Sequence, residues 1–337
     1  MDFKKLTTRF RQFGGLRLLK EYAKTGALRP AMKAFCRCII KRQSFKAIYP
    51  EVLKTIVPFL EKRYHRFMLD RKRFYQLQEF EHQRHKIIWF CWLQGLDDAP
   101  PIVNACYASL NCIQHSESFD ASGPNTDPVY HIQVIDNNNW REYVELPDYV
   151  VRKWEKKQIP AANFSDLLRL ELLIKYGGTW IDSTVLCTGF GTQATQKALA
   201  FLDADLFLFQ YTPEGTANGI SISNWFITAC TNNEVLMVLR DMLYEYWKEF
   251  DCTLDYYMFH LFFRMVAAEY PDQIKAMPYG SSQRSIALTP HWNEPFNQEQ
   301  WEKLVSKVAF HKLSHRVDKR VVDNKNNYYN YIVHYYL

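Results

Sequence analysis

Several features that define common protein classes are missing from this sequence. No apolar run comes near the roughly 18 residues of a membrane-spanning helix, and the N-terminus lacks the apolar core of a signal peptide. The eight cysteines include no C-x-x-C pair, which argues against a zinc site and favours free thiols in a reducing cytoplasm. We therefore expect a protein that neither spans a membrane nor is secreted.

The motifs of several enzyme classes are also absent. The sequence contains no G-x-S-x-G, no G-x-x-x-x-G-K-[ST] and no H-E-x-x-H, the signatures of many serine hydrolases, phosphate-binding-loop enzymes and zinc proteases. No pair of acidic residues can be assigned from spacing as acid and nucleophile, which weakens a glycosidase interpretation. Aromatic residues, by contrast, make up 16% of the chain and could supply stacking surfaces for sugars or bases, although most aromatics simply pack a core.

Basic charge is concentrated at the N-terminus. Residues 1–75 carry 20 lysines and arginines against 5 acidic residues, whereas the rest carries 22 against 31. Patterns of basic amphipathic helices cover residues 3–19, 31–40 and 50–68, with Gly14-Gly15 and Pro58 as expected interruptions. Such helices suit an anionic membrane surface, where each cation contributes about 1 kcal/mol. A merely solvated face is the alternative, and the acidic remainder argues against nucleic acid as a partner.

From residue 85 onwards, strand and helix patterns alternate. The expected strands cover residues 85–92, 130–136, 179–185, 206–211 and 220–227, and the expected helices cover residues 101–114, 162–176, 234–249 and 255–268. Strand, helix, strand in this order predicts parallel βαβ units in an α/β fold. We divide the chain into a basic helical region (1–80), an α/β domain (81–320) and a C-terminal tail (321–337).

The helix expected over residues 162–176 carries the first candidate site residues. Asn163 or Ser165 can cap its start and Gly177 can end it. Asp166 and Arg169 stand three residues apart, so they share a helix face near the N-terminus, where a hydroxylated anionic ligand would be favoured. An ordinary intrahelical ion pair is the alternative.

The ends of the expected strands add further candidates. In an open α/β sheet, ligands bind beyond the carboxyl ends of the strands, which here selects Trp92, Asp136 and Asp182. Gly177 and Gly178 precede the strand that ends at Asp182, and glycines there would let the backbone approach a ligand.

These residues resemble a known family. Ser165-Asp166-Leu-Leu-Arg169, followed by Tyr176-Gly177-Gly178-Thr-Trp-Ile-Asp182, is similar to the DXD-type sugar-transferase signature of glycosyltransferase family 32, and more closely resembles the capsular polysaccharide synthesis proteins. Lys86-Ile-Ile-Trp-Phe-Cys-Trp92 resembles the first strand of that family, and His311-Lys312-Leu313 its C-terminal motif. The resemblance covers about residues 84–315 and leaves the basic N-terminus unexplained.

The resemblance implies a GT-A-like fold, a Rossmann-type mixed sheet flanked by helices. It also implies a nucleotide-sugar donor and transfer with retention of anomeric configuration. Trp92 would stack on the base, Asp166 and Arg169 would hold the sugar and diphosphate, and Asp182 would take the first DXD position. Gly177, Gly178 and Lys312 complete the implied donor site.

The expected metal site departs from the DXD pattern at one position, because Thr184 stands where the pattern has its second acidic residue. A divalent cation, Mn²⁺ or Mg²⁺, normally bridges the diphosphate through oxygen ligands. The ligands here would be Asp182, Thr184 and His311. Alternatively, Arg169 and Lys312 could stabilise the leaving group electrostatically.

Further candidates lie in the C-terminal half. Asn224 and Trp225 follow the pattern of a strand and could bind the acceptor, with the indole as a sugar platform. Asp255, with His260 in Asp-Tyr-Tyr-Met-Phe-His, could orient the acceptor hydroxyl as a catalytic group; a helix N-terminal charge is the alternative for Asp255.

The sequence as a whole predicts a glycosyltransferase at the inner face of the cytoplasmic membrane. It would move a hexose or amino-hexose from a nucleotide sugar, with UDP preferred, to a growing polysaccharide or lipid-linked oligosaccharide. The alternative is an inactive carbohydrate-binding or assembly protein on the same fold, which Thr184 supports.

Overall fold

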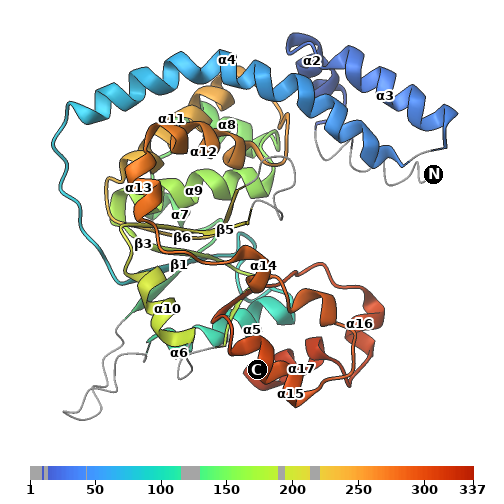
Figure 1. The fold of residues 1–337 in the computed structure, drawn as a ribbon, viewed down its shortest axis with the longest axis vertical. Helices are drawn as coiled ribbons and strands as arrows, with labels where there is room; N and C mark the ends of the chain where they lie inside the picture. The colour runs from blue at the N-terminus through green and yellow to red at the C-terminus, as the bar shows by residue number, and fades with distance from the viewer. Residues whose placement is uncertain (1–9, 11–13, 43, 115–129, 189–193, 213–220) are drawn as a thin grey trace.

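The computed structural model describes residues 10, 14–42, 44–114, 130–188, 194–212 and 221–337 (Figure 1). Its strands are β1 (Ile87–Cys91), β2 (His131–Ile135), β3 (Gly178–Asp182), β4 (Val185–Cys187), β5 (Leu206–Gln210), β6 (Ile222–Ala229) and β7 (Phe310–Lys312). The helices of the first half are α2 (Leu16–Lys24), α3 (Leu28–Ile40), η1 (Phe45–Ala47), α4 (Ile48–Gln76), α5 (Pro101–Ser109), α6 (Asn111–Gln114), α7 (Trp140–Tyr143), α8 (Asp148–Glu155) and α9 (Ala161–Tyr176). Those of the second half are α10 (Ala194–Leu202), α11 (Glu234–Glu249), α12 (Met258–Glu269), α13 (Pro271–Ala276), α14 (Ser282–Ser285), η3 (Thr289–His291), α15 (Gln298–Val305), α16 (Lys319–Asp323) and α17 (Tyr328–Tyr336).

A five-stranded sheet in the order β2-β1-β3-β6-β5 forms the centre of the molecule. β1 runs parallel to both β2 and β3, whereas β6 runs antiparallel to β3 and to β5. β4 and β7 form a separate antiparallel pair. The predicted parallel βαβ units are therefore confirmed for the first three strands, and the sheet as a whole is mixed and flanked by helices, as expected for this α/β class.

Helices cover both faces of the sheet (Figure 1). Because successive side chains of a strand point to opposite faces, Trp89 joins the core under α9, α11 and α12, whereas Ile88 and Phe90 join the core under α5 and α17. β5 alternates in the same way, with Leu208 on the first face and Phe207 on the second. β1, β3, β5 and β6 are buried at nearly every position, as expected for strands covered on both faces, whereas the edge strand β2 is only partly buried.

The long helix α4 corrects one expectation about the N-terminal region. Pro58 was expected to interrupt the helix, but α4 continues through it. A proline inside a helix costs about 3 kcal/mol, and burial of Ile56, Leu60 and Tyr64 against the helices of the first core offsets that cost. α4 thus shares the core of the α/β domain.

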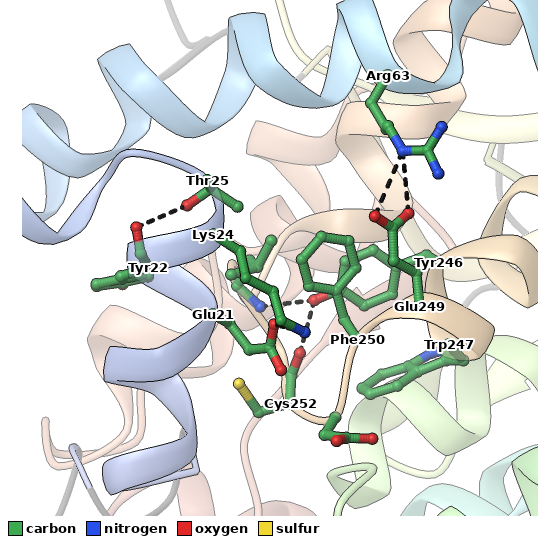
Figure 2. Close-up of polar contacts among 12 residues, drawn as sticks. Glu21, Tyr22, Lys24, Thr25, Arg63, Tyr246, Trp247, Glu249, Phe250 and Cys252 are labelled. Atoms are coloured by element: carbon green, nitrogen blue, oxygen red, sulfur yellow. Dashed lines mark hydrogen bonds and ion pairs between the residues drawn. The ribbon is translucent and has the colours of Figure 1, made fainter.

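The helix α2 is fastened to the loop that follows α11 (Figure 2). Gly14, with φ of +114°, lies so close to this loop that an added Cβ would stand 2.7 Å from the Cβ of Cys252. The ammonium of Lys24 pairs with Glu21 at 2.7 Å and lies 5.7 Å from the ring centroid of Phe250. Gly14-Gly15 does interrupt the N-terminal helical pattern, as expected, and most of residues 3–13 lie outside the described residues.

The helix α9 and the strand after it depart from the expected boundaries. α9 begins directly after Pro160, so neither Asn163 nor Ser165 caps it: Asn163 accepts a hydrogen bond from Thr253, and Ser165 donates one to the Ala161 carbonyl. Gly177, with φ of +63°, ends the helix as expected. The strand expected over residues 179–185 is divided into β3 and β4 by a turn that contains Thr184.

Among the described residues, no helix has the length and apolarity needed to cross a membrane. The described cysteines are free thiols, and all of them except Cys36 are buried.

Candidate active site

The parallel strands bring the predicted strand-end residues to one edge of the sheet. Cys91 is in register with Asp182 on one side and with Ile135 on the other, so Trp92, Asp136 and Asp182 all lie where their strands end. Asp136 is engaged locally, because its Oδ1 accepts hydrogen bonds from the backbone N–H groups of Asn138 and Asn139. Asp182 and Trp92 therefore remain as the ligand-facing candidates of this edge.

Asp182 is the centre of a cluster of charged groups. Its Oδ2 accepts a hydrogen bond of 2.8 Å from the ammonium of Lys312. Its Oδ1 accepts one of 2.9 Å from the indole of Trp180 and lies 3.4 Å from Arg169 Nη2. The side chains of Asp182 and Lys312 are 26% and 23% exposed, whereas that of Arg169 is only 5% exposed. Lys312 and Asp182 thus form the open part of the cluster, and Arg169 forms its floor.

The guanidinium of Arg169 is fixed by contacts with several neighbouring residues. Its guanidinium lies 4.9 Å from the ring centroid of Trp180, donates to the carbonyls of Ser165 and Asn224, and lies 3.5 Å from Asp166 Oδ1. The predicted pairing of Asp166 and Arg169 on one helix face is therefore present, and it belongs to a larger network that also reaches Asp182.

Asn224 connects β6 to this network. Its amide donates a hydrogen bond of 2.8 Å to Asp166 Oδ1, and its carbonyl accepts one from Arg169. Asn224 was predicted to bind the acceptor; its described contacts instead position Asp166 and Arg169.

The two carboxylates of the cluster have opposite electrostatic environments. Burial raises the pKa of Asp166 to about 6, although Arg169 and the hydrogen bond from Asn224 act in the other direction. Burial would also raise the pKa of Asp182, but the charges of Lys312 and Arg169 outweigh it and hold this pKa below its ordinary value. Asp182 is therefore a firmly ionised carboxylate, whereas Asp166 is the more readily protonated of the two.

Tyr256, just before α12, and His260, within α12, bring two aromatic rings towards the cluster. Burial, followed by the carboxylates of Asp166 and Asp182, raises the pKa of Tyr256, a residue that is still 53% exposed. Burial, followed by the charge of Arg169, lowers the pKa of His260 to about 3, so its imidazole is neutral. His260 was a sequence candidate, whereas Tyr256 was missed, because a tyrosine beside a predicted acid carries no spacing signal of its own.

Trp92 lies against His315, a residue that sequence reasoning missed. The two rings meet edge to face with centroids 5.2 Å apart, and within the described part of the chain the buried indole N–H of Trp92 has no hydrogen-bond partner. His315 stands three residues after Lys312, so the motif that identified Lys312 could have pointed to it. Together the rings of Trp92 and His315 form an aromatic surface beside the Asp182 cluster.

Five predicted site residues occupy positions that do not fit their assigned roles. Gly177 and Gly178 lie at the end of β3 opposite to Asp182. An added Cβ at Gly178 would stand 2.4 Å from the Ile87 carbonyl oxygen. Gly178 therefore allows β3 to approach β1, and Gly177 packs against the backbone of Gln83 and Ala229. Neither glycine faces a ligand site at the Asp182 end. Trp225 is buried and stacks on Phe209 with centroids 4.5 Å apart, so it is a core residue and no sugar platform.

Asp255 and His311 are the other two predicted site residues whose positions do not fit their assigned roles. Asp255 is buried, its Oδ1 accepts the backbone N–H of Tyr257, and burial raises its pKa while Tyr49 faces it. Within the described part of the chain it forms no hydrogen bond or ion pair with Asp182, and the local role at the start of α12 fits it better than catalysis. His311 points away from Asp182 and hydrogen-bonds to Thr188 Oγ1 at 3.0 Å, and burial lowers its pKa to about 4.

The donor set does not fit the expected divalent cation. Of the three predicted ligands, Asp182 and Thr184 lie together but His311 does not. The oxygen atoms of Asp182 and Thr184 already receive hydrogen bonds from Lys312. Across the described ranges, no group of three or more His, Cys, Asp or Glu side chains is arranged to hold a metal ion. The ammonium of Lys312 lies at the oxygen atoms that such a cation would bind, and like-charge repulsion opposes the cation there.

This chain resembles a solved structure and a protein family. Among solved structures, the chain is similar to one described as PaToxG glycosyltransferase, with 14% sequence identity and a TM-score of 0.34 over 74% of this chain and 94% of that chain. No curated protein matches. The family model of the capsular polysaccharide synthesis proteins matches residues 37–332, which include α4 and every residue of the Asp182 cluster. The chain belongs to the capsular polysaccharide synthesis protein family.

Proposed function

We propose that this protein is a glycosyltransferase that takes a sugar from a nucleotide-sugar donor and adds it to a growing glycan. The observation that carries the proposal is the partly exposed pair of Asp182 and Lys312 at the carboxyl edge of the parallel strands, 2.8 Å apart and next to Trp92. A carboxylate can accept hydrogen bonds from sugar hydroxyls, and an ammonium can hold a phosphate. Neighbouring groups of these two kinds match the two halves of a sugar diphosphate.

The positions of these residues support a separate role for each of them in donor binding. Trp92 and His315 present aromatic surface for the base, and the ammonium of Lys312 contacts the diphosphate. Asp182 binds hydroxyls of the transferred sugar, and Arg169 acts as a positioning residue because its guanidinium is buried and fully engaged. Preorganised cations beside a leaving diphosphate stabilise the charge that develops on it in the transition state.

The proposed reaction transfers a hexose or amino-hexose with retention of configuration, as the family resemblance implies. The bond between the anomeric carbon and the diphosphate oxygen breaks, and a bond from that carbon to the acceptor oxygen forms on the same face of the sugar. The acceptor's hydroxyl proton leaves with the nucleoside diphosphate. UDP is the preferred nucleotide, and the acceptor is a polysaccharide or lipid-linked oligosaccharide.

The test is release of nucleoside diphosphate from a donor panel of UDP-glucose, UDP-galactose, their N-acetylated forms and GDP-mannose. We expect slow hydrolysis of one donor by the wild type, and a loss of ~100-fold or more in Asp182→Asn, since this change removes the charge that Lys312 and Arg169 share. Asp98→Asn, at an exposed aspartate, is the matched control. Full activity of Asp182→Asn would exclude this site assignment.

We also propose that the N-terminal helices place the enzyme on the anionic inner face of the cytoplasmic membrane. α2 and α3 expose large apolar side chains, namely Leu16, Met32, Ile39 and Ile40. Exposed cations lie on the same two helices, namely Arg17, Lys20, Lys33 and Arg37. Apolar and cationic side chains displayed together are what an anionic lipid surface binds. A lipid-linked acceptor would then be met at the surface where it resides.

A second candidate function is carbohydrate binding without turnover. Thr184 at the second DXD position favours it, because one acidic residue of the expected pair is missing. This candidate predicts a donor or glycan that stabilises the protein against heat but is never cleaved. Detection of any nucleotide release above that of Asp182→Asn rejects it.

A further inference from the structure

The ammonium of Lys312 lies between the two DXD positions. It donates a hydrogen bond of 2.8 Å to Asp182 Oδ2 and one of 2.7 Å to Thr184 Oγ1. These are the oxygen atoms that would bind a divalent cation if the DXD pattern worked in its usual way. A protein cation thus occupies the position between the two side chains from which a metal would bridge to the donor's diphosphate.

The backbone holds Lys312 firmly at this position. Lys312 is in register with Val185 in the pair of β7 and β4. Its carbonyl accepts a hydrogen bond from Thr289 Oγ1, and the next residue, Leu313, donates its N–H to the Thr184 carbonyl at 2.8 Å. The residue that supplies the ammonium and the turn that supplies Thr184 are therefore joined by backbone hydrogen bonds, and their relative position is set by the fold.

The charges of the cluster are already balanced. Asp182 lies within 3.4 Å of Arg169 and within 2.8 Å of Lys312, and Asp166 is buried against Arg169 and Asn224. A divalent cation would have to displace the ammonium from Asp182 and would then lie beside it, which like-charge repulsion opposes. A donor diphosphate, in contrast, brings negative charge to the partly exposed ammonium of Lys312. The present partner of this ammonium, Asp182, is also paired with Arg169.

We propose that Lys312 replaces the bridging metal of this site, so that the donor's diphosphate is bound by the Lys312 ammonium and the Thr184 hydroxyl without a divalent cation. This proposal rests on the proposed function, since it concerns the same donor. On this proposal Thr184 does not impair the donor site, although it stands where the DXD pattern has its second acidic residue. A second carboxylate at that position would compete with the diphosphate for the ammonium, whereas a hydroxyl can donate a hydrogen bond to a phosphate oxygen.

The experiment is calorimetric titration of the full chain with UDP and, separately, GDP, in EDTA and in excess MnCl₂. We expect the wild type to bind one of the two nucleotides with the same affinity, within about twofold, in both conditions. Lys312→Met should lose ~10-fold or more in affinity, the scale of one charge-assisted hydrogen bond. Lys312→Arg should retain part of it. Lys307→Met, at an exposed lysine before β7, is the matched control and should bind like the wild type.

A double variant supplies the converse test. Lys312→Ala combined with Thr184→Asp removes the ammonium and restores the second carboxylate, so nucleotide binding should become dependent on Mn²⁺. Wild-type binding that EDTA abolishes and Mn²⁺ restores would overturn the proposal and leave the glycosyltransferase function intact. If neither nucleotide binds the wild type in either condition, the proposed function fails, and this proposal fails with it.

Discussion

Trp180 and Asp182 lie two residues apart on the same face of β3, and the indole N–H of Trp180 donates a 2.9 Å hydrogen bond to Asp182 Oδ1. The same indole lies under the guanidinium of Arg169, 4.9 Å from it. One buried aromatic side chain therefore orients both the carboxylate of Asp182 and the arginine that forms the floor of the cluster.

Trp180→Phe tests this relationship. The substitution keeps an aromatic face for Arg169 but removes the donor to Asp182, so we expect transfer to fall ~10-fold, in kcat more than in KM. It also leaves a small cavity and should lower the free energy of unfolding by roughly 1–2 kcal/mol. Nucleotide release and urea unfolding measure the two effects. Trp247→Phe, a buried tryptophan outside the cluster, is the control that should lose stability but keep activity.

Asp166 predicts a pH dependence of stability. Its pKa of about 6 in the folded protein lies above its ordinary value of 3.8. Its contribution to stability is therefore fully present below pH 3.8 and is lost as the pH rises through about 6, a change of roughly 3 kcal/mol. Asp166→Asn removes this titration, so its stability relative to the wild type should increase between pH 4 and pH 7. Urea unfolding at several pH values measures the difference, and a constant difference would contradict the burial argument.

Trp92 predicts a loss of nucleotide affinity. If its ring and that of His315 hold the base, Trp92→Ala should weaken UDP binding by ~10-fold or more, the scale of one lost stacking contact. Inorganic pyrophosphate has no base, so its affinity should change little. Calorimetry with both ligands makes the comparison within one variant, and an unchanged UDP affinity would exclude the stacking role.

The N-terminal helices predict charge-dependent binding to lipid. Lys33→Glu combined with Arg37→Glu reverses two exposed charges of α3 and should weaken binding to vesicles containing phosphatidylserine by ~10-fold or more. Lys303→Glu combined with Lys307→Glu, on and just after α15, changes the net charge equally and should bind like the wild type. Sedimentation with vesicles measures both, and equal losses in the two variants would indicate a general charge effect without a specific membrane face.

Local patterns in the sequence predicted much of the fold. The helix expected over residues 234–249 is α11 with the same boundaries, and the expected strands match β1, β2, β5 and β6 within about two residues. Apolar periodicity and turn residues carry this information within a short stretch of chain. Pro58 shows the limit of such reasoning, because the packing that keeps α4 continuous involves α11 and α12, which lie far along the chain.

The site was predictable where one motif contains the interacting residues. Asp166 and Arg169 share a helix face, and Asp182 ends a parallel strand, so spacing alone placed them correctly. Lys312 was identified, but its position between Asp182 and Thr184 depends on the pairing of β4 with β7, residues more than a hundred positions apart. Trp225 and Asp255 were misassigned because their chemistry suits a site, whereas burial, which sequence does not show, gives them other roles.

The pairing of β7 with β4 also bears on how the protein is made. The proposed donor site combines Trp92 near the first strand with Lys312 on the last, and α17 packs against α5 beyond it, with Tyr336 donating a hydrogen bond to the Cys187 carbonyl. A chain still being synthesised has the sheet and most of the helices before it has Lys312. Such a chain, or one truncated before residue 312, lacks Lys312 and α17, so the proposed donor site is completed only as synthesis ends.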